Sequence, residues 1–581
     1  MNGKGQKICS IIREKFRFST LSFLFIIVYV NLFPLVLGPE NSIVGVIFTI
    51  MMSASMVRDY TAAPWKHLLI QCLVLVWMAL AAYWVNVLPA AASFLINFVT
   101  ILVILYAFTY EYSSHMYFPY ILSYLFLVFI SPVDGAHMPR RLLGMLVGAV
   151  SILLYQWVMG RKRVSETAKD VLTQMTDEIS EFIAYRLGDR EEQPDLSDTR
   201  HKLCRISQTV FDRRKKAFCV SEAGFSMVDA GRGLESLLIL LHELPEDLNQ
   251  EKVQMLRKIL VCLKEFRGFL QQETTSLPEI EEDAFLLVHE EKTGQLFYQT
   301  VAYIRDRLMH MTDPQNKTRF RKTALSIAVR LEAVLDFGTV RAVYAIRTAL
   351  LLSCATLLVQ LLGLPHGKWL LFTIASTSLP YADDVPLKIK KRVLATVIGG
   401  LAAVLIYSLI PSAVGRTAAM MLSGYLSFYF SDYTGTFACS TIGALGGAVF
   451  MTAFGTGAVS SMFLIRLCYI LAGAAIAYLF NCLVLPYSRA RATRQLWKKY
   501  KSITELLTAV CREEQPDTQL YYSLVLQAHM IEEKLSKNAV LEDWKELPGL
   551  LETCRSQVRL AHRRHIAERK DAVIFETGHL A

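Results

Sequence analysis

Apolar stretches of about 17 to 25 residues, the length that a helix needs to cross a bilayer, dominate two separate blocks of this sequence, residues 18–160 and 343–486. Backbone amides in lipid have no water to bind, so such stretches fold as helices that satisfy their own hydrogen bonds. The sequence therefore predicts an all-α polytopic membrane protein with about six transmembrane helices in each block.

The expected spans are separated by short turn segments. The spans near residues 120 and 375 are among the shortest. In the first block they are 18–37, 42–57, 67–86, 88–109, 116–132 and 140–159. In the second block they are 345–363, 368–380, 392–410, 416–430, 437–455 and 461–485.

The two blocks share residues at matching positions. The segment Ile47–Ile50 recurs as Leu371–Ile374, an offset of 324 positions (371 − 47). Duplicated membrane modules occur in many transporters, because two halves can rock about a site held between them. The sequence therefore predicts two repeats and favours transport. Three more pairs keep a similar register: Asp59 with Asp383, Arg141 with Arg466, and Gly148 with Gly473.

Basic residues predict the orientation. Lys and Arg precede the first span and follow the sixth, at Arg161–Arg163, whereas the expected outer turn 38–41 carries neither. Because short cytoplasmic loops are enriched in Lys and Arg, both termini are expected in the cytoplasm and the two repeats are expected to be parallel. We expect the plasma membrane as the location, and the first apolar run is too long for a cleavable signal peptide.

Charged, periodic segments outside the two blocks predict cytoplasmic helices. Apolar residues from Val171 to Ile183 follow helical spacing, which is typical of an amphipathic helix. We expect a cytoplasmic N-terminus at 1–17, a cytoplasmic helical domain at 161–342 and a C-terminal cytoplasmic helical segment at 487–581. The net charge of +10 is spread among acidic residues on these helices. It favours lipid headgroups and not nucleic acid as the partner.

Neither an enzyme nor a bound cofactor is indicated. The eleven cysteines are scattered, without a Cys-x-x-Cys pair. His562 and His565 lie three residues apart, but two basic residues separate them and no acidic or Cys ligand is near, so a solvated tail is favoured over a metal site. A phosphate-binding loop and the common hydrolase motifs are also missing from the sequence.

The two arginines of the last spans are the first candidate site. An ionisable side chain inside a span is costly, which favours a functional or ion-paired role for Arg141 and Arg466. The alternative is that both snorkel to the headgroups as anchors. Glycines near them predict close helix packing. Gly473 and Asn481 lie on the same helical face as Arg466, and Gly144, Gly148 and Tyr155 lie on the same helical face as Arg141. Gly399 and the pair Gly443–Gly447 are further packing candidates.

Acidic residues at two loops are candidates for carrying protons. Asp383 and Asp384 are adjacent, and repulsion between neighbouring carboxylates favours proton uptake by one of them. The alternative is a solvated cytoplasmic turn. An acid, a tyrosine and a hydroxyl also recur between the fourth and fifth spans of each block, as Glu111–Ser113 and Asp432–Thr434. Asp59, the counterpart of Asp383, completes the set of proton-coupling candidates.

Several motifs of the second block have the order and spacing of a known family. They are Arg347, then 363–369, then 392–400, then Arg466 with Asn481, and finally Leu485–Pro486. This block resembles the fusaric acid resistance protein-like transporters, which include aromatic acid exporters and are distantly similar to aluminium-activated malate transporters. The first block lacks the Pro-His-Gly-Lys-Trp turn and the Arg-x-x-x-Thr-x-x-Gly signature, which argues against two equal substrate sites.

The resemblance implies export of small organic anions, among them aromatic carboxylic acids, coupled to proton entry. In the residues themselves, arginines can hold a carboxylate and aromatic rings can stack on a substrate ring. A passive organic-anion channel gated by its cytoplasmic domain, and a non-transporting scaffold, stay open as alternatives. A homo-oligomer is a possible assembly, as is a complex with a periplasmic adaptor if the cell has an outer membrane. The candidate substrate residues are Arg141, Arg392, Arg466, Trp369, Tyr433 and Asn481.

Overall fold

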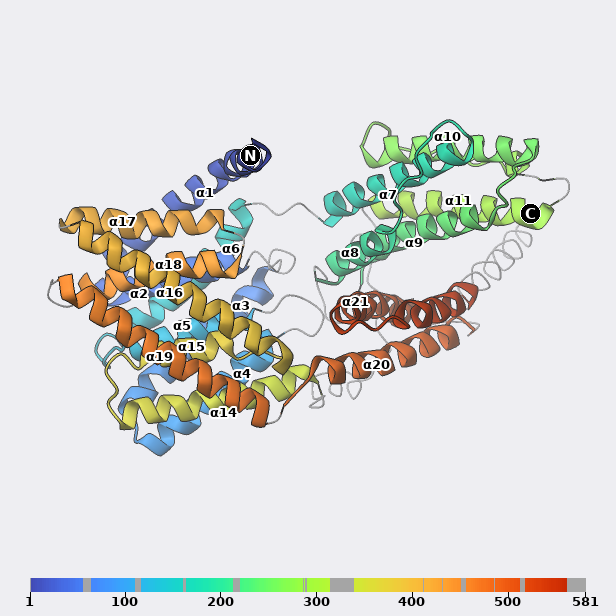
Figure 1. The fold of residues 1–581 in the computed structure, drawn as a ribbon. Helices are drawn as coiled ribbons and strands as arrows, with labels where there is room; N and C mark the ends of the chain where they lie inside the picture. The colour runs from blue at the N-terminus through green and yellow to red at the C-terminus, as the bar shows by residue number, and fades with distance from the viewer. Residues whose placement is uncertain are drawn as a thin grey trace. The chain divides into compact units, whose positions relative to one another are not determined.

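The computed structural model describes residues 2–55, 64–109, 116–159, 164–212, 220–285, 287, 290–313, 339–410, 412–430, 432–450, 456–484, 486–512 and 518–561. These residues form helices joined by turns, with no strand among them, so the predicted all-helical class is confirmed for this part of the chain. The helices divide into two compact units. We call them the membrane unit and the polar unit, and Figure 1 labels their helices.

The membrane unit contains both apolar blocks. Its helices in the first block are α1 Asn2–Leu37, α2 Ser42–Ser55, α3 Pro64–Val87, α4 Ala90–Phe108, α5 Tyr117–Phe129 and α6 Met138–Met159. Those in the second block are α14 Val340–Leu361, α15 Lys368–Thr377, α16 Val385–Leu409, α17 Ala413–Leu426, α18 Tyr433–Phe450 and α19 Thr456–Leu483.

Seven helices in the described part of the chain are long and apolar enough to cross a membrane. They are Ser19–Leu37, Pro64–Val87, Ala90–Phe108, Met138–Val158, Val340–Leu361, Ala382–Leu409 and Val459–Leu483. The expected spans 42–57, 116–132, 368–380 and 416–430 are shorter than predicted: α2 has 14 residues, α5 has 13, α15 has 10 and α17 has 14. At roughly 1.5 Å per residue, none of the four reaches the thickness of the hydrocarbon core. Short helices can exist at that depth only where protein covers their ends.

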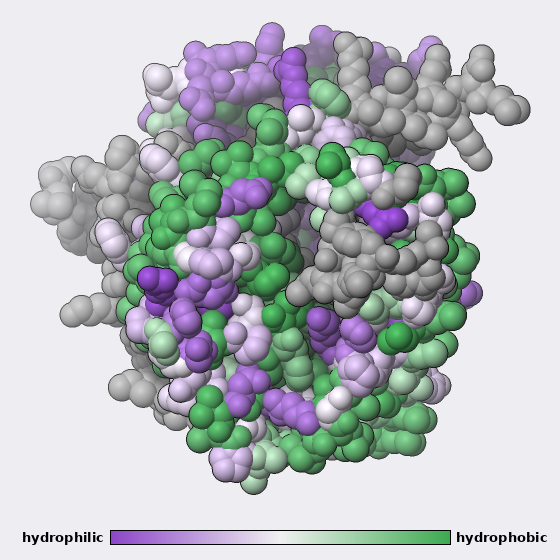
Figure 2. Space-filling model, turned by 90° about the vertical axis from the view of Figure 1, so that its left-hand side faces the viewer, coloured by the Kyte–Doolittle hydropathy of each residue, from purple (hydrophilic) through white to green (hydrophobic). Residues whose placement is uncertain are grey.

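Helix α16 shows why this unit is suited to lipid. Between Arg392 and Leu405 its exposed residues are apolar and recur every three or four positions, at Leu394, Ile398, Leu401 and Leu405. Its buried face carries Arg392 together with small residues. Apolar side chains outside and a charge inside reverse the usual arrangement of a water-soluble protein. Figure 2 shows one end of the unit, where hydrophobic residues dominate the periphery and hydrophilic residues gather in patches among them.

Helices at matching places in the two blocks have matching neighbours. In the first block α6 packs against α2 and α3, and in the second block α19 packs against α15 and α16. Contacts between the blocks match as well. The first helix of each block contacts the fourth helix of the other, since α14 contacts α4 and α1 contacts α17. A duplicated module is expected to give this pattern.

Three of the candidate packing glycines allow close helix approach. A Cβ at Gly148 would lie 1.9 Å from the ring of Phe48. A Cβ at Gly399 would lie 2.4 Å from the carbonyl oxygen of Ala438, and one at Gly473 would lie 2.9 Å from that of Leu370. The other candidate glycines have more space. A Cβ added at Gly144 or Gly443 would lie 3.4 Å or more from its nearest neighbour, and a Cβ at Gly447 would have no described atom within 4 Å.

The polar unit contains α7 Val164–Arg186, α8 Thr199–Asp212, α9 Glu222–Glu243, α10 Gln250–Leu270, α11 Glu291–Thr312, α20 Arg489–Val510 from Thr493 onward, α21 Thr518–Glu542 and a helix at 547–561. Helix α9 lies at its centre, packed against α7, α8 and α11, and most of its residues are buried.

A buried carboxylate joins four helices of the polar unit. Glu532, on α21, has a side chain that is 2% exposed and accepts hydrogen bonds from Arg200, Arg555 and Tyr500. Burial alone would raise its pKa, but the positive charges of Arg200 and Arg555 offset burial and hold the pKa well below its usual range. Glu532 is therefore ionised at neutral pH and compensates two arginines.

We expect Glu532→Gln to lower the free energy of unfolding of the polar unit by about 3 kcal/mol, because it leaves two guanidinium groups without their counter-charge. Since the pKa is lower in the folded state, this contribution is complete at neutral pH and is lost as the pH falls through the acid range. Hydrogen exchange of α8 and α21 in the purified protein measures the effect. Glu246→Gln, at an exposed position, is the control. Equal exchange in the two variants would contradict the role of Glu532.

The glycines provide a second prediction. Gly399→Ala must displace a backbone carbonyl, so we expect it to destabilise the membrane unit by about 1 to 3 kcal/mol. Gly447→Ala, with open space around it, should leave stability within about 0.5 kcal/mol. The two substitutions add the same methyl group, so the melting temperatures of the two proteins in detergent compare the packing directly. Equal melting temperatures would show that α16 and α18 are not in close contact.

Candidate functional site

The short helix α15 ends inside the membrane unit in a polar segment. Its last residues, Ser376 and Thr377, are buried, as is Ser378, which has an extended backbone. The side chains of the neighbouring helices bind the groups that follow. The hydroxyl of Tyr344 donates to the Ser378 carbonyl at 3.1 Å, and Arg347 donates to the Leu379 carbonyl at 2.6 Å. The free end of α15 is therefore held by protein, as a helix end in lipid requires.

Two buried arginines lie next to this helix. Arg392 on α16 and Arg466 on α19 are each 6% exposed. They lie close enough for their charges to repel each other. Neither forms an ion pair with a carboxylate of the described residues, and the Nε of each has no hydrogen-bond partner there. Two buried positive charges are thus left without a negative one among the described residues.

Aromatic rings surround these charges. The guanidinium of Arg466 lies 5.3 Å from the centre of the Trp369 ring, and that of Arg392 lies 4.5 Å from the centre of the Phe437 ring. The Nζ of Lys388 lies 3.6 Å from the centre of the Tyr433 ring. The negative faces of aromatic rings attract cations. We call Trp369, Lys388, Arg392, Tyr433, Phe437 and Arg466 the arginine–aromatic site.

Close packing of four helices assembles this site. Helix α16 approaches α18 at Gly399, and it approaches α19 at Gly400, where a Cβ would meet the ring of Phe463. Both approaches occur about two turns beyond Arg392 along α16. The hydroxyl of Tyr433 lies near Arg392 and Ser376.

Arg141 is used differently from Arg466. It is 1% exposed, and its Nη2 donates to the Glu40 carbonyl at 2.7 Å and to the Ser131 hydroxyl at 2.8 Å. These bonds connect the turn between α1 and α2 with the segment between α5 and α6. Gly144, one turn further along α6, faces Asn41 in the same region. Arg141 therefore lies outside the arginine–aromatic site and holds the first block together.

Asn481 also lies outside that site. Its amide donates to the Ala477 carbonyl and reaches the Ser378 hydroxyl at 3.5 Å, so it contributes to holding the end of α15. Gln156 does the same for α2, donating to the Ser55 carbonyl at 2.5 Å. Sequence reasoning chose the adjacent Tyr155 for the first block. The offset of 325 positions that relates Arg141 to Arg466 also relates Gln156 to Asn481, and this signal would have identified Gln156.

The acidic candidates are held away from the arginines. Asp383 accepts a hydrogen bond from the backbone nitrogen of Arg489 at 2.6 Å, and Asp384 pairs with the guanidinium of that residue. Asp432 is exposed and accepts from the backbone nitrogen of Gly435 at 2.8 Å, at the start of α18. Asp59 and Glu111–Ser113 are outside the described residues. In the described part, the acids that sequence reasoning singled out are engaged elsewhere.

The two matching arginines should respond oppositely to loss of charge. Arg141→Gln removes two charge-assisted hydrogen bonds, so we expect the membrane unit to lose about 2 kcal/mol of stability. Arg466→Gln removes an uncompensated buried charge, so stability should stay equal or rise. Both proteins are heated in the same detergent, and the fraction that stays monodisperse at each temperature measures their thermal unfolding. A melting temperature that falls as far in Arg466→Gln as in Arg141→Gln would show that Arg466 has a partner.

Comparison with known proteins identifies this region. Residues 354–480 match the model of a family described as fusaric acid resistance protein-like. The matched segment contains the whole arginine–aromatic site, which confirms the predicted family resemblance for the second block. The chain matches no curated protein and no solved structure. The chain is thus a multi-pass membrane protein whose second block is similar to the fusaric acid resistance proteins.

Proposed function

We propose that this protein transports small organic anions, with aromatic carboxylic acids as the class that fits its site best. One observation carries the proposal: Arg392 and Arg466 are both buried, each beside an aromatic ring, and no carboxylate of the described residues pairs with either. A buried charge that lacks a counter-charge is costly, and an anion from outside the chain removes that cost. The match to a family named for resistance to an organic acid supports the same class of function.

Each residue of the site has a role in this proposal. The two guanidinium groups bind the carboxylate through charge-assisted hydrogen bonds. Trp369 and Phe437 contact the ring of the substrate, and the hydroxyl of Tyr433 accepts or donates one hydrogen bond. Lys388 adds attraction for anions at the start of α16. Because the first block lacks counterparts of Arg392 and Lys388, one substrate site per chain is proposed.

The arrangement of helices supports a moving transporter. We propose that the two blocks are repeats, since their helices have matching neighbours. Transporters built from repeats bind substrates next to broken helices near the middle of the membrane, where one repeat can rock against the other. We propose that helix α15, which ends at Thr377 beside Arg347 and Asn481, acts as such a helix. We place the protein in the plasma membrane with both termini in the cytoplasm, as the basic residues predict, and export as the direction.

The source of energy separates two versions of the proposal. In the first, protons enter as the anion leaves, carried by Asp383, Asp384, Asp432 or Asp59. In the second, the protein is a passive anion channel. The contacts of the three described acids count against them as proton carriers, since Arg489 binds Asp383 and Asp384 while Asp432 binds the start of α18.

Uptake of radiolabelled hydroxybenzoate into everted membrane vesicles tests the site. We expect Arg466→Gln and Arg392→Gln each to lower the rate at least about tenfold, because each loses a charge-assisted hydrogen bond of roughly 1.5 to 3 kcal/mol to the substrate. Lys391→Gln, at the exposed position next to Arg392, is the control and should keep the normal rate. Normal uptake by correctly inserted Arg466→Gln protein would overturn the assignment.

The same vesicles distinguish a pump from a channel. A proton gradient is imposed and then collapsed with an ionophore. Accumulation of hydroxybenzoate above the outside concentration that disappears with the gradient establishes proton coupling. Movement that only equalises the two concentrations establishes the channel.

A further inference from the structure

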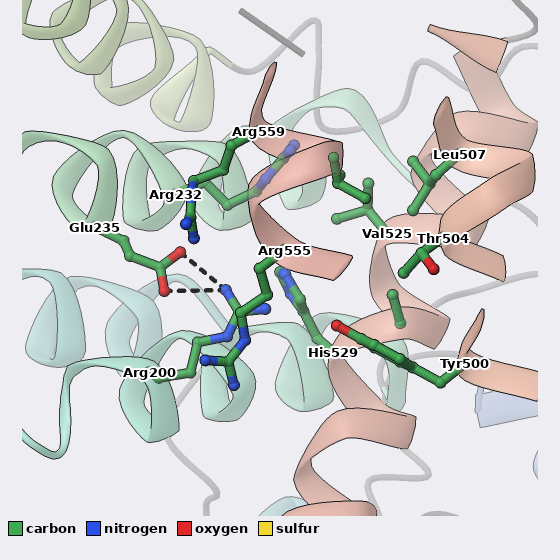
Figure 3. Close-up of a pocket in the computed structure, with 12 residues that line it drawn as sticks. Arg200, Arg232, Glu235, Tyr500, Thr504, Leu507, Val525, His529, Arg555 and Arg559 are labelled. Carbon is green, nitrogen blue, oxygen red and sulfur yellow. Dashed lines mark hydrogen bonds and ion pairs between the residues drawn. The ribbon is translucent and has the colours of Figure 1, made fainter. Parts of the chain in front are cut away.

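The polar unit contains a cavity far in sequence from the arginine–aromatic site. Helices α8, α9, α20 and α21 and the helix at 547–561 enclose it, and Figure 3 shows the side chains that line it. The cavity and its solvent-open mouth together enclose about 450 Å³.

One wall of the cavity is cationic. Arg200, Arg232, Arg555 and Arg559 line it, and Glu235 is the carboxylate among the lining residues. Figure 3 shows these five side chains gathered on one side of the cavity. The other acids that bind these arginines, such as Glu532, do not line the cavity. They bind the guanidinium groups from outside the lining, so that four arginines and one carboxylate line the cavity itself.

Donors remain available on this wall. A guanidinium has five N–H groups. Among the described residues Arg232 uses only its Nη1, which donates to Asp229 at 2.9 Å and to Tyr521 at 2.8 Å. Arg559 uses one nitrogen, toward Glu552. The Nε of Arg555 is buried and has no acceptor in the described part of the structure, and such a donor costs free energy until a ligand supplies one.

The rest of the lining is largely apolar. Leu507, Val525, Ala528 and Val558 line the cavity together with Tyr500 and Thr504. Figure 3 shows Leu507 and Val525 on the side away from the arginines. His529, at the back, adds no positive charge, because burial and then the charge of Arg200 hold its pKa well below the usual range. A ligand that satisfies both walls therefore has an anionic head and a small apolar body.

We propose that this cavity binds a small organic carboxylate, with its carboxylate against Arg232, Arg555 and Arg559 and its apolar body against Leu507, Val525 and Ala528. The proposal adds a second ligand site, in the polar unit, to the one proposed for transport. It rests on the cavity alone and holds whether or not the membrane unit transports anions.

Equilibrium binding of radiolabelled benzoate to the purified full chain in detergent tests the proposal. All measurements use the Arg466→Gln background, so that the membrane site does not contribute. Arg559→Gln removes part of the cationic wall, and Ala528→Leu fills the cavity from the apolar wall. We expect each to weaken benzoate binding at least about tenfold, the loss of one charge-assisted hydrogen bond or of the ligand's space. Arg257→Gln, at an exposed position on α10, should bind as the background does.

Hydrogen exchange locates the bound benzoate. In the background protein benzoate should slow exchange in the second half of α20 and in the helix at 547–561, and Ala528→Leu should abolish this protection. Inorganic phosphate serves as a probe of the head group and should compete weakly, because it lacks an apolar body.

Three results would overturn the proposal. They are the absence of benzoate binding by the background protein, equal affinity in Arg559→Gln, Ala528→Leu and Arg257→Gln, and protection confined to the membrane unit. Phosphate that competes as well as unlabelled benzoate would refute the apolar half of the assignment. If either Arg559→Gln or Ala528→Leu fails to fold, the other variant still tests the cavity, since the two change different parts of its lining.

Discussion

The positive charge buried at Arg392 and Arg466 is the constraint on which the membrane unit depends. Removing a guanidinium from water costs several kcal/mol even after the protein relaxes. The rings of Trp369 and Phe437 return about 0.5 to 2 kcal/mol each, which is less than that cost. The packing of α15, α16, α18 and α19 must supply the difference. A fold that tolerates this cost in the absence of a ligand is suited to bind an anion.

The comparison of Arg466 with Arg141 shows that a charge alone does not define a site. Both arginines stand seven residues before a glycine. Each glycine packs against the short second helix of its own block, Gly148 against α2 and Gly473 against α15. Arg141 meets the Glu40 carbonyl, presented by a turn that starts at Gly38 with φ 97°. In the second block the turn differs, with His366 at φ 62° stacked on Trp369. Arg466 thus faces an aromatic ring where Arg141 faces a carbonyl.

Local pattern predicted the helices well, because apolar length and turn residues act within each segment. It also predicted the difference between the blocks, since the altered turn is visible in the sequence. The nearness of Arg392 and Arg466 was not predictable in the same way, because it depends on α16 packing against α19 at Gly400. Gly443 and Gly447 show the same limit. Their spacing is that of a packing motif, but only the surrounding structure decides whether a second helix approaches.

The two arginine clusters of the chain differ in what a ligand changes. In the polar unit Glu532 lies against Arg200 and Arg555, so most of the charge is compensated before any ligand arrives. In the membrane unit the described residues supply no such carboxylate. Ligand binding stabilises a protein in proportion to the affinity of its folded state for the ligand. An anion in the membrane site replaces an unfavourable buried charge with a paired one, whereas an anion in the polar cavity adds to a network that is already stable. A larger share of the binding free energy is therefore available in the membrane site to change the arrangement of helices, which is what a transport step requires.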